Sequence, residues 1–229
     1  MCGRFDTTHL YWRDIHEQLS SLIPVATAPI NLEPNGDVRP TTQQLVARRE
    51  GEGADARWAL EKMRWSLVPF WRNGKPLKDT EKGMGDGFNL TTFNCKVENF
   101  FRLSDADEEP KRPATFREAF KARRCIVPAS GWYEWTGPAG AKVKHRFTRA
   151  DGGIIWFAGM WDRCATPDAG EVRSFTILTG PSAGGLAEYH DRAPVILERD
   201  EWATWLDPEG DATALVRAVR PERFAVGAA

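Results

Sequence analysis

The stretch Cys125-Ile126-Val127-Pro128-Ala129-Ser130-Gly131-Trp132-Tyr133-Glu134-Trp135 contains two short β-type runs, 125–128 and 131–135, which are separated by a small turn. Apolar and aromatic residues make up most of both runs, as is typical of strands. Short runs of this kind, separated by Gly and Pro, recur along the chain. They favour a curled, barrel-like sheet with helices around it. The sequence therefore predicts an α+β fold built on a mostly antiparallel sheet.

The elements on either side of this stretch are predicted from the same signals. Further strands are expected at 44–47, 58–63, 143–149, 154–161, 174–179 and 195–197. Helices are expected at 8–22, 115–123, 200–206 and 212–219. The turn Ala150-Asp151-Gly152-Gly153 predicts a hairpin between the strands that flank it. Thr115-Phe116-Arg117-Glu118 is a capping-box pattern, which predicts the start of the second helix.

The length and composition of the chain indicate one folded domain spanning 1–229. A hydrophobic fraction of 41% and ten tryptophans are enough for a substantial core. Two segments are expected to be surface insertions, because neither is long enough to form a domain. Residues 73–87 are rich in Lys and Gly, and residues 104–114 carry an acidic run and two prolines.

Charge and cysteine content narrow the functional classes. The formal net charge is −1, so any nucleic-acid partner has to be held by a local groove rather than by the charge of the whole molecule. The four cysteines are scattered and form no CxxC pair, which argues against a metal site or a disulfide framework. Neither a signal-peptide core nor an apolar run long enough to span a membrane is present. These features predict a cytoplasmic protein with reduced thiols.

The N-terminus reads Met1-Cys2-Gly3-Arg4-Phe5. Removal of Met1 leaves Cys2 with a free α-amine and a thiol on the same residue. In short peptides the pKa of such an amine is about 7.7–8.0 and that of the thiol about 8.5, so both groups are partly reactive near neutral pH. Such a 1,2-aminothiol can capture an aldehyde as an imine and close a five-membered thiazolidine ring. From this residue alone, an accidental cysteine at position 2 is equally consistent.

Six segments together resemble the SOS response associated peptidase (SRAP) family, whose members attach covalently to abasic sites in single-stranded DNA. The segments are Met1-Cys2-Gly3-Arg4, Val38-Arg39-Pro40-Thr41-Thr42, Trp65-Ser66-Leu67-Val68-Pro69-Phe70-Trp71, Phe93-Asn94-Cys95-Lys96-Val97-Glu98, the opening stretch 125–135, and His190-Asp191-Arg192-Ala193-Pro194-Val195-Ile196-Leu197. Each segment alone is weak evidence, but all six follow the order of the family over nearly the whole chain.

The resemblance implies four catalytic residues. Cys2 matches the residue whose amine and thiol form the crosslink, and Asn94 matches the asparagine that lies against it. Glu134 matches the catalytic glutamate; a carboxyl group between two aromatic residues is expected to have a raised pKa suited to proton transfer. His190 matches a histidine that moves protons at the sugar ring. Without the resemblance, a solvent-facing strand glutamate and an ordinary loop histidine explain the last two equally well.

The resemblance also implies a set of DNA contacts. These are Arg4, Lys96 and Arg192 at phosphates, Trp65, Trp71 and Trp135 against bases, and Pro40 and Thr179 lining the site. Planar guanidinium groups suit phosphate oxygens, and aromatic faces accept any base. For each tryptophan, burial in the core is an equally good explanation. Surface arginines are often simply solvated.

The chain departs from the family pattern in two places. Asn94-Cys95-Lys96 stands where the family usually has Asn-Ala-Arg, so the phosphate contact at Lys96 loses the bidentate fork of arginine. Cys95 adds a second thiol near the proposed site, and we expect it to be a small buried residue. The acidic segment 105–109 is also unexpected, since it would repel DNA if it approached the groove.

The predicted function is the sensing of abasic sites in single-stranded DNA and their shielding as a thiazolidine crosslink. No cofactor is required, the protein is expected to act as a monomer, and it is expected at the nucleoid when bound to DNA. Weak lyase activity follows if the imine fails to close. Removal of Met1 is consistent both with assistance by Cys2 and with a separate methionine aminopeptidase. The family name fits a peptidase activity in the same site.

Two other functional classes are also compatible with the sequence. Class II glutamine amidotransferases also begin Met-Cys-Gly and use the N-terminal thiol as nucleophile, and Asn35-Gly36-Asp37 faintly resembles their Asn-Gly motif. Arg4-Phe5 does not fit the apolar residue and glycine that normally follow in those enzymes. A non-catalytic module that binds single-stranded DNA is the other alternative, and it predicts salt-labile binding that is independent of Cys2.

Overall fold

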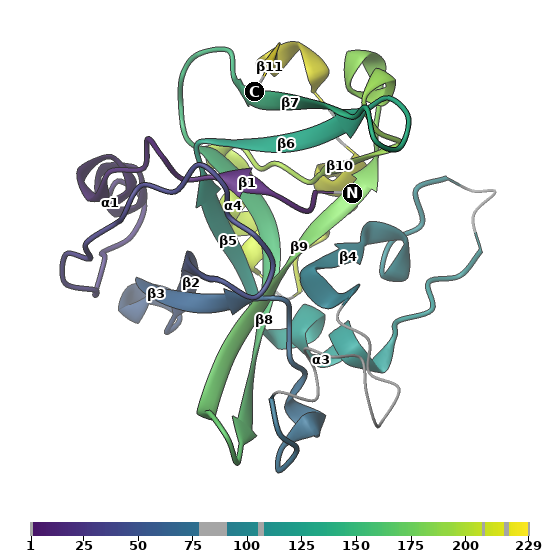
Figure 1. Ribbon diagram of the computed structural model, residues 1–229. Coiled ribbons are helices and arrows are strands. Elements are labelled where there is room, and N and C mark those ends of the chain that lie inside the picture. Colours follow the sequence, from purple (N-terminus) through teal and green to yellow (C-terminus); the bar gives the residue numbers. More distant parts are fainter. Residues whose placement is uncertain (1, 78–90, 105–107, 208, 218–219, 229) are drawn as a thin grey trace.

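The computed structural model describes residues 2–77, 91–104, 108–207, 209–217 and 220–228 (Figure 1). Five strands close a mixed barrel, in which β9 pairs with both β3 and β8. Around the barrel these strands are β9 (Gly170–Pro181), β3 (Arg57–Trp65), β2 (Gln43–Glu50), β5 (Arg124–Ala129) and β8 (Ile155–Thr166). Only the β3–β9 pair among these is parallel. The predicted barrel-like α+β fold is therefore confirmed.

A second, four-stranded antiparallel sheet lies above the barrel in Figure 1. Its strands are, in order, β1 (Phe5–Asp6), β6 (Gly131–Thr136), β7 (Val143–Arg149) and β11 (Phe224–Ala228). Two further short strands pair with the last residues of β9. These are β4 (Asn94–Lys96), which is parallel to it, and β10 (Arg192–Pro194), which is antiparallel. The N-terminus, β4 and β10 thus meet near one end of the barrel.

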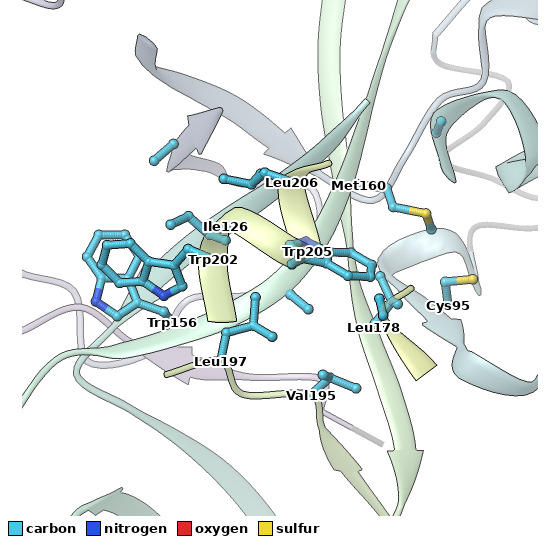
Figure 2. Close-up of a cluster of buried hydrophobic side chains, with 14 of the residues drawn as sticks. Cys95, Ile126, Trp156, Met160, Leu178, Val195, Leu197, Trp202, Trp205 and Leu206 are labelled. Carbon is cyan, nitrogen blue, oxygen red and sulfur yellow. The ribbon is translucent and has the colours of Figure 1, made fainter. Parts of the chain in front are cut away.

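Side-chain alternation along the barrel strands creates two hydrophobic clusters, because successive residues face opposite sides of a sheet. Val46, Trp65, Val127, Phe157 and Phe175 belong to the cluster inside the barrel, together with Cys2 and Phe5. Their neighbours on the outer face form the cluster in Figure 2, which is covered by helices.

The helices are short and pack mainly on the outer face. Within the part of the chain that the structure describes, they are α1 (Trp12–Ser20), α3 (Ala114–Ala122), α4 (Trp202–Leu206) and α5 (Thr213–Arg217). The ring of Trp202 lies 4.8 Å from that of Trp156 and 6.0 Å from that of Trp58, so α4 is held against strands β8 and β3 by aromatic packing (Figure 2). Single-turn 3₁₀ helices connect other elements: Gly53–Asp55, Phe70–Arg72, Thr91–Phe93, Val97–Asn99, Gly184–Glu188, Arg199–Glu201 and Pro221–Arg223.

The predicted hairpin at Ala150-Asp151-Gly152-Gly153 is wrong. The two strands exist, but β7 pairs with β6 and β11, whereas β8 pairs with β5 and β9. The turn therefore carries the chain from the upper sheet into the barrel. A turn signal predicts a reversal of direction, but it does not specify which neighbours the two strands take.

Several predicted boundaries also need correction. The first helix begins only at Trp12 rather than at residue 8. The capping box is wrong, because Pro113 occupies the N-cap position of α3 and no side chain caps that end. The strand expected at 195–197 starts earlier, as β10, and Ile196 makes only an isolated bridge to Phe157. Residues 78–87 of the first insertion, residues 105–107 of the second and residues 218–219 of the last helix lie outside the described residues.

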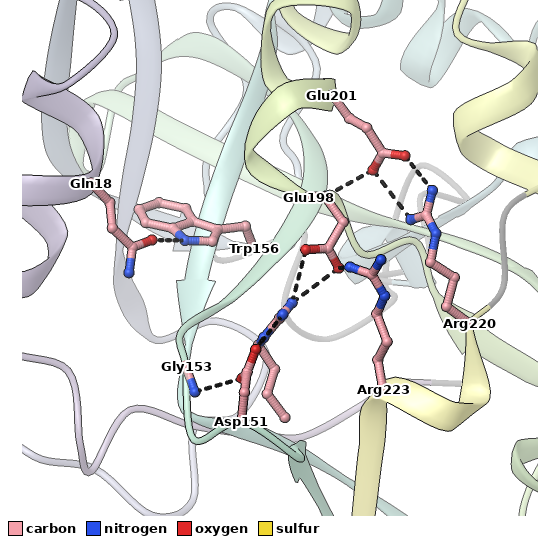
Figure 3. Close-up of polar contacts among 9 residues, drawn as sticks. Gln18, Asp151, Gly153, Trp156, Glu198, Glu201, Arg220 and Arg223 are labelled. Carbon is pink, nitrogen blue, oxygen red and sulfur yellow. Dashed lines mark hydrogen bonds and ion pairs between the residues drawn. The ribbon is translucent and has the colours of Figure 1, made fainter.

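An ion-pair network attaches the C-terminal part of the chain to β7 (Figure 3). Arg149 contacts Asp151 at 2.7 Å and Glu198 at 3.0 Å, and Glu198 also pairs with Arg223 at 2.7 Å. Beside them, Glu201 pairs with Arg220. Because networks with partly buried members are less screened than isolated surface pairs, this cluster helps to keep β11 in register at the edge of the upper sheet.

Candidate active site at the N-terminus

Cys2 is completely buried beside the barrel interior. The Nδ2 atom of Asn94 donates a hydrogen bond of 2.8 Å to the Cys2 carbonyl. Asn94 is itself fixed in β4, where it pairs with Ile177 of β9, and Phe5 of β1 pairs with Trp132 of β6. Strands β4 and β6 therefore both hold the N-terminal segment in place.

Glu134 lies on β6 two residues after Trp132, so both side chains point to the inner face of the upper sheet. Glu134 is buried, with only 4% of its surface exposed. Burial raises the pKa of Glu134 from its ordinary 4.5 to about 7, and the charge of Asp191 acts in the same direction. The predicted rise in pKa is thus confirmed, but its cause is burial on the inner face, because Tyr133 and Trp135 alternate to the opposite face of β6. At neutral pH, both the acid and the carboxylate form of this group are populated.

The thiol of Cys2 responds to the same surroundings. Burial raises the pKa of Cys2 above its usual value, and the negative charge of Glu134 raises it further. Among the described residues, the Sγ–H group has one long contact, of 4.0 Å, to the Arg4 carbonyl oxygen. In the chain that still carries Met1, this sulfur is therefore a protonated thiol at neutral pH, and a base is needed to activate it.

His190 lies in the turn before β10. Its Nδ1 atom accepts a hydrogen bond of 2.9 Å from the backbone N–H of Arg192, and the Asp191 carboxylate lies 2.7 Å from the same nitrogen. Burial lowers the pKa of His190, while Asp191 opposes that shift. A neutral ring that accepts at Nδ1 carries its proton on Nε2.

Arg192 is engaged within the protein. Its two Nη atoms contact the two carboxylate oxygens of Glu98 at 2.7 and 2.8 Å. Nη2 also donates to the carbonyl of Thr179 at 2.6 Å, and the Arg192 side chain is only 12% exposed. Thr179 is fully buried, and its contact with the site is its hydrogen bond to Arg192. Lys96, in contrast, is exposed on β4. Of the two predicted phosphate contacts Arg192 and Lys96, Lys96 is therefore the one on the surface.

Arg4 lies on the other face of the upper sheet, over Trp135. Its guanidinium carbon is 5.4 Å from the centre of the Trp135 ring, and its Nη1 atom pairs with Asp37 at 3.0 Å. Arg39 shares the same carboxylate at 2.6 Å, which leaves one acidic group between two arginines. Pro40 follows directly and is partly buried. This aromatic and basic surface is separate from the inner face that holds Glu134.

The two tryptophans of the 65–71 segment have different environments. Trp65 is completely buried; its Nε1 atom donates to the Phe93 carbonyl at 2.8 Å, and its ring packs against Phe5 and Phe175. The expectation that Trp65 stacks on a base is therefore wrong, because the barrel core already covers both of its faces. Trp71 is 42% exposed in the 3₁₀ turn Phe70–Arg72, so its ring can still be reached.

Substitution separates these two roles. Trp65→Ala is expected to lower the free energy of unfolding by about 3–5 kcal/mol, since a large core side chain is lost. Trp71→Ala is expected to change it by less than about 1 kcal/mol, while weakening single-stranded DNA binding by about 1–3 kcal/mol if a base stacks there. Urea unfolding and fluorescence anisotropy measure the two effects. Equal destabilisation by both substitutions would contradict this assignment.

Cys95 is not part of the Cys2 environment. Alternation along β4 turns its side chain away from that of Asn94 and into the outer cluster, near Met160 and Leu178 (Figure 2). Burial raises the pKa of Cys95 to about 12, and Asn99 Nδ2 contacts its sulfur at 3.5 Å. The expectation of a small buried residue is confirmed.

Two acidic residues of this region were missed as site residues by sequence reasoning: Glu98 and Asp37. Glu98 lies 94 positions from its partner Arg192, and no local pattern links residues so far apart. Asp37 precedes Arg39 by two positions, so a short charge pattern was available for that pair. Within the described part of the chain, no group of three His, Cys, Asp or Glu residues is arranged to hold a metal ion, and no helix is long and apolar enough to cross a membrane.

Comparison with known proteins gives a consistent family assignment. The sequence profile of the SOS response associated peptidase (SRAP) family matches residues 1–226. The abasic site processing protein YoqW of Bacillus subtilis is 27% identical over 212 residues, covering 91% of this chain and 81% of that protein. The abasic site processing protein HMCES of Xenopus tropicalis is 30% identical over 183 residues, covering 70% of this chain and 50% of that protein.

A solved structure shares the fold. A protein from Bordetella bronchiseptica superimposes with a TM-score of 0.70 at 23% identity, and the match covers 100% of this chain and 99% of the other.

Proposed function

Because this chain belongs to the SOS response associated peptidase family, we propose that it processes abasic sites in DNA. More specifically, we propose that it acts on single-stranded DNA and that Cys2, after removal of Met1, forms a thiazolidine with the abasic sugar. The observation that carries this proposal is the placement of Cys2. Its carbonyl is held by Asn94 at 2.8 Å, and its thiol lies within the electrostatic influence of Glu134, whose pKa is about 7.

The proposed reaction begins with the open-chain aldehyde of the abasic sugar. The α-amine of Cys2 attacks C1′ and forms a carbinolamine. The protonated carboxyl group of Glu134 donates a proton, so the hydroxyl leaves as water and an iminium ion remains. The resulting Glu134 carboxylate then takes the thiol proton, and Sγ closes the ring by adding to the same carbon. One C–N bond and one C–S bond form, one water is released, and Glu134 is returned to its acid form.

Positioning accounts for much of the expected rate. Well-oriented intramolecular reactions reach effective molarities of about 10⁵–10⁸ M, and Asn94 restrains the residue that carries both nucleophiles. His190 assists by moving a proton during ring opening of the sugar. Single-stranded DNA is the favoured substrate because an unstacked sugar is easier to reach than one within a duplex. An iminium that sulfur does not close into the ring permits β-elimination at the 3′ phosphate, and this step accounts for the proposed weak lyase activity.

The direct test is incubation with a single-stranded oligonucleotide that contains one abasic site. A conjugate that survives heat on a denaturing gel is expected, and mass spectrometry should find Cys2 as the first residue of the conjugated chain. Oligonucleotides with an intact base or with a tetrahydrofuran analogue, which has no aldehyde, serve as controls. Salt-labile binding without any conjugate would favour a simple binding module instead.

Asn94→Ala is expected to slow conjugate formation by about 10-fold or more. The substitution removes the side-chain amide that donates to the buried Cys2 carbonyl, and the loss of this hydrogen bond also costs about 1–3 kcal/mol of stability. Single-turnover gel assays and urea unfolding measure the two effects. Asn99→Ala is the matched control, because that amide contacts Cys95 and not Cys2. Conjugation by Asn94→Ala at the wild-type rate would remove Asn94 from the proposed site.

A further inference from the structure

Glu98 ties together three separate elements next to the proposed site. It lies in the turn Val97–Asn99, directly after β4, and its carboxylate binds Arg192 of β10 in a bidentate arrangement. The same guanidinium group bonds to Thr179 of β9, through both its carbonyl at 2.6 Å and its hydroxyl at 3.4 Å. Bidentate arginine–carboxylate pairs are geometrically specific as well as strong. The orientation of Arg192 is thus set by residues from two other elements.

The backbone of Arg192 in turn meets His190. Its N–H donates to Nδ1 at 2.9 Å, in competition with the Asp191 carboxylate, which lies 2.7 Å from that nitrogen. The Arg192 N–H favours an unprotonated Nδ1, whereas Asp191 favours a proton there. The Arg192 N–H and the Asp191 carboxylate therefore act in opposite directions on which ring nitrogen of neutral His190 carries the proton.

We propose that Glu98 is a positioning residue for the reaction: by clamping the Arg192 side chain to β9, it holds the Arg192 N–H against Nδ1 and keeps the proton of His190 on Nε2. The inference rests on the proposed function, in which His190 moves a proton at the sugar. It also accounts for the burial of Arg192, which a residue reserved for phosphate contact does not need. Because Glu98 follows β4 by two residues, the same clamp restrains the strand that carries Asn94.

A competing role for Glu98 leads to the opposite result. If a DNA phosphate displaces Glu98 from Arg192, the carboxylate is a competitor, and removing its charge should strengthen DNA binding. If Glu98 positions His190, removing its charge should leave binding nearly unchanged and slow the chemical step. Measuring affinity and rate separately therefore distinguishes the two roles.

The test compares Glu98→Gln and Glu98→Ala with the wild-type chain. Affinity is measured with a tetrahydrofuran-containing oligonucleotide, and the maximal rate of conjugation with a true abasic oligonucleotide under single-turnover conditions. We expect the rate to fall by about 10- to 100-fold in both variants, with less than about a 3-fold change in Kd. Asp151→Asn is the matched control, since Asp151 also forms a bidentate pair with an arginine, Arg149, but on the β7–β8 turn.

A spectroscopic readout tests the clamp independently of any activity. In ¹⁵N-labelled protein, the ring nitrogens of His190 are assigned by comparison with His190→Gln. The wild-type and Asp151→Asn chains are expected to show the Nε2–H tautomer, and both Glu98 variants a mixture that includes Nδ1–H. Arg192→Lys, which cannot form the bidentate pair, should shift the tautomer in the same way. Combining Arg192→Lys with Glu98→Gln in one chain is expected to change the His190 tautomer little further, because both substitutions break the same ion pair.

Each outcome is decisive. An unchanged His190 tautomer in folded Glu98→Gln and Glu98→Ala protein overturns the proposal, as does faster conjugation with tighter DNA binding. A shifted tautomer with slower conjugation at unchanged Kd supports it. If the wild-type chain forms no conjugate at all, the proposed function fails, but the tautomer still reports whether the clamp exists.

Discussion

Replacing Cys2 with serine is expected to abolish the heat-stable conjugate, with a loss of at least about 100-fold under conditions in which the wild-type chain reacts fully. Serine keeps the α-amine, so imine formation can still occur, but its hydroxyl is a far weaker nucleophile than sulfur and does not lock the adduct. Conjugates of the serine variant should therefore appear only after reduction with borohydride. Denaturing gels with and without borohydride measure both species.

Cys95→Ala is the control for this substitution. Cys95 is also a buried thiol and is next to Asn94 in sequence, but its side chain faces the outer cluster. The alanine variant is expected to conjugate at the wild-type rate. A heat-stable conjugate of equal yield with Cys2→Ser would contradict the thiazolidine, and so would conjugated wild-type protein that still retains Met1.

Glu134→Gln is expected to slow conjugation by about 10²–10⁴-fold, the usual contribution of a general acid–base group. The reaction needs the acid form of Glu134 and the neutral form of the α-amine. In the wild-type chain, the rate should therefore rise with pH as the α-amine is deprotonated. It should fall again above a pH of about 7 as the Glu134 carboxyl group is deprotonated, which gives a bell-shaped pH profile. The glutamine variant should lose the alkaline limb. Single-turnover rates between pH 6 and about 9 test this.

The same substitution should stabilise the fold at alkaline pH. The pKa of Glu134 is about 7 in the folded chain against an ordinary 4.5, so the folded state binds the proton more tightly. This tighter proton binding by Glu134 contributes about 3 kcal/mol to the free energy of unfolding. The contribution is fully present below pH 4.5 and is lost as the pH rises through about 7. Glutamine has no charge to bury, so Glu134→Gln should be more stable than wild type at pH 8.

Urea unfolding at acidic and alkaline pH measures this difference. Glu171→Gln is the control, because Glu171 is an exposed carboxylate and should show no such gain. If wild type and Glu134→Gln lose stability equally as the pH rises, the pKa of Glu134 is not raised in the folded protein. A stabilised variant that no longer conjugates would show that the buried acid is kept for chemistry at the expense of stability.

Much of the architecture was predictable from local patterns. Alternating and aromatic runs predicted the barrel strands at 125–128, 58–63 and 174–179, since side-chain period and β-propensity are written in consecutive residues. The raised pKa of Glu134 was also predicted, although its cause is burial on the inner face of the upper sheet rather than the aromatic residues on either side of it in sequence. The resemblance to the family rested on short ordered segments, and the family match over residues 1–226 bears it out.

Other features depend on contacts between distant parts of the chain. Local sequence was enough to predict the five barrel strands and the aminothiol candidate at Cys2, but not the short strands β1, β4 and β11. The proton-transfer role expected of Glu134 came from the resemblance to the family. Three features became visible only in the folded chain: β7 and β8 enter different sheets, Trp65 is enclosed by the barrel, and Glu98 meets Arg192. The difference is one of range, because strand period and burial preference act between neighbours in sequence, whereas strand partners and ion pairs are chosen only when the closed barrel brings separate segments together.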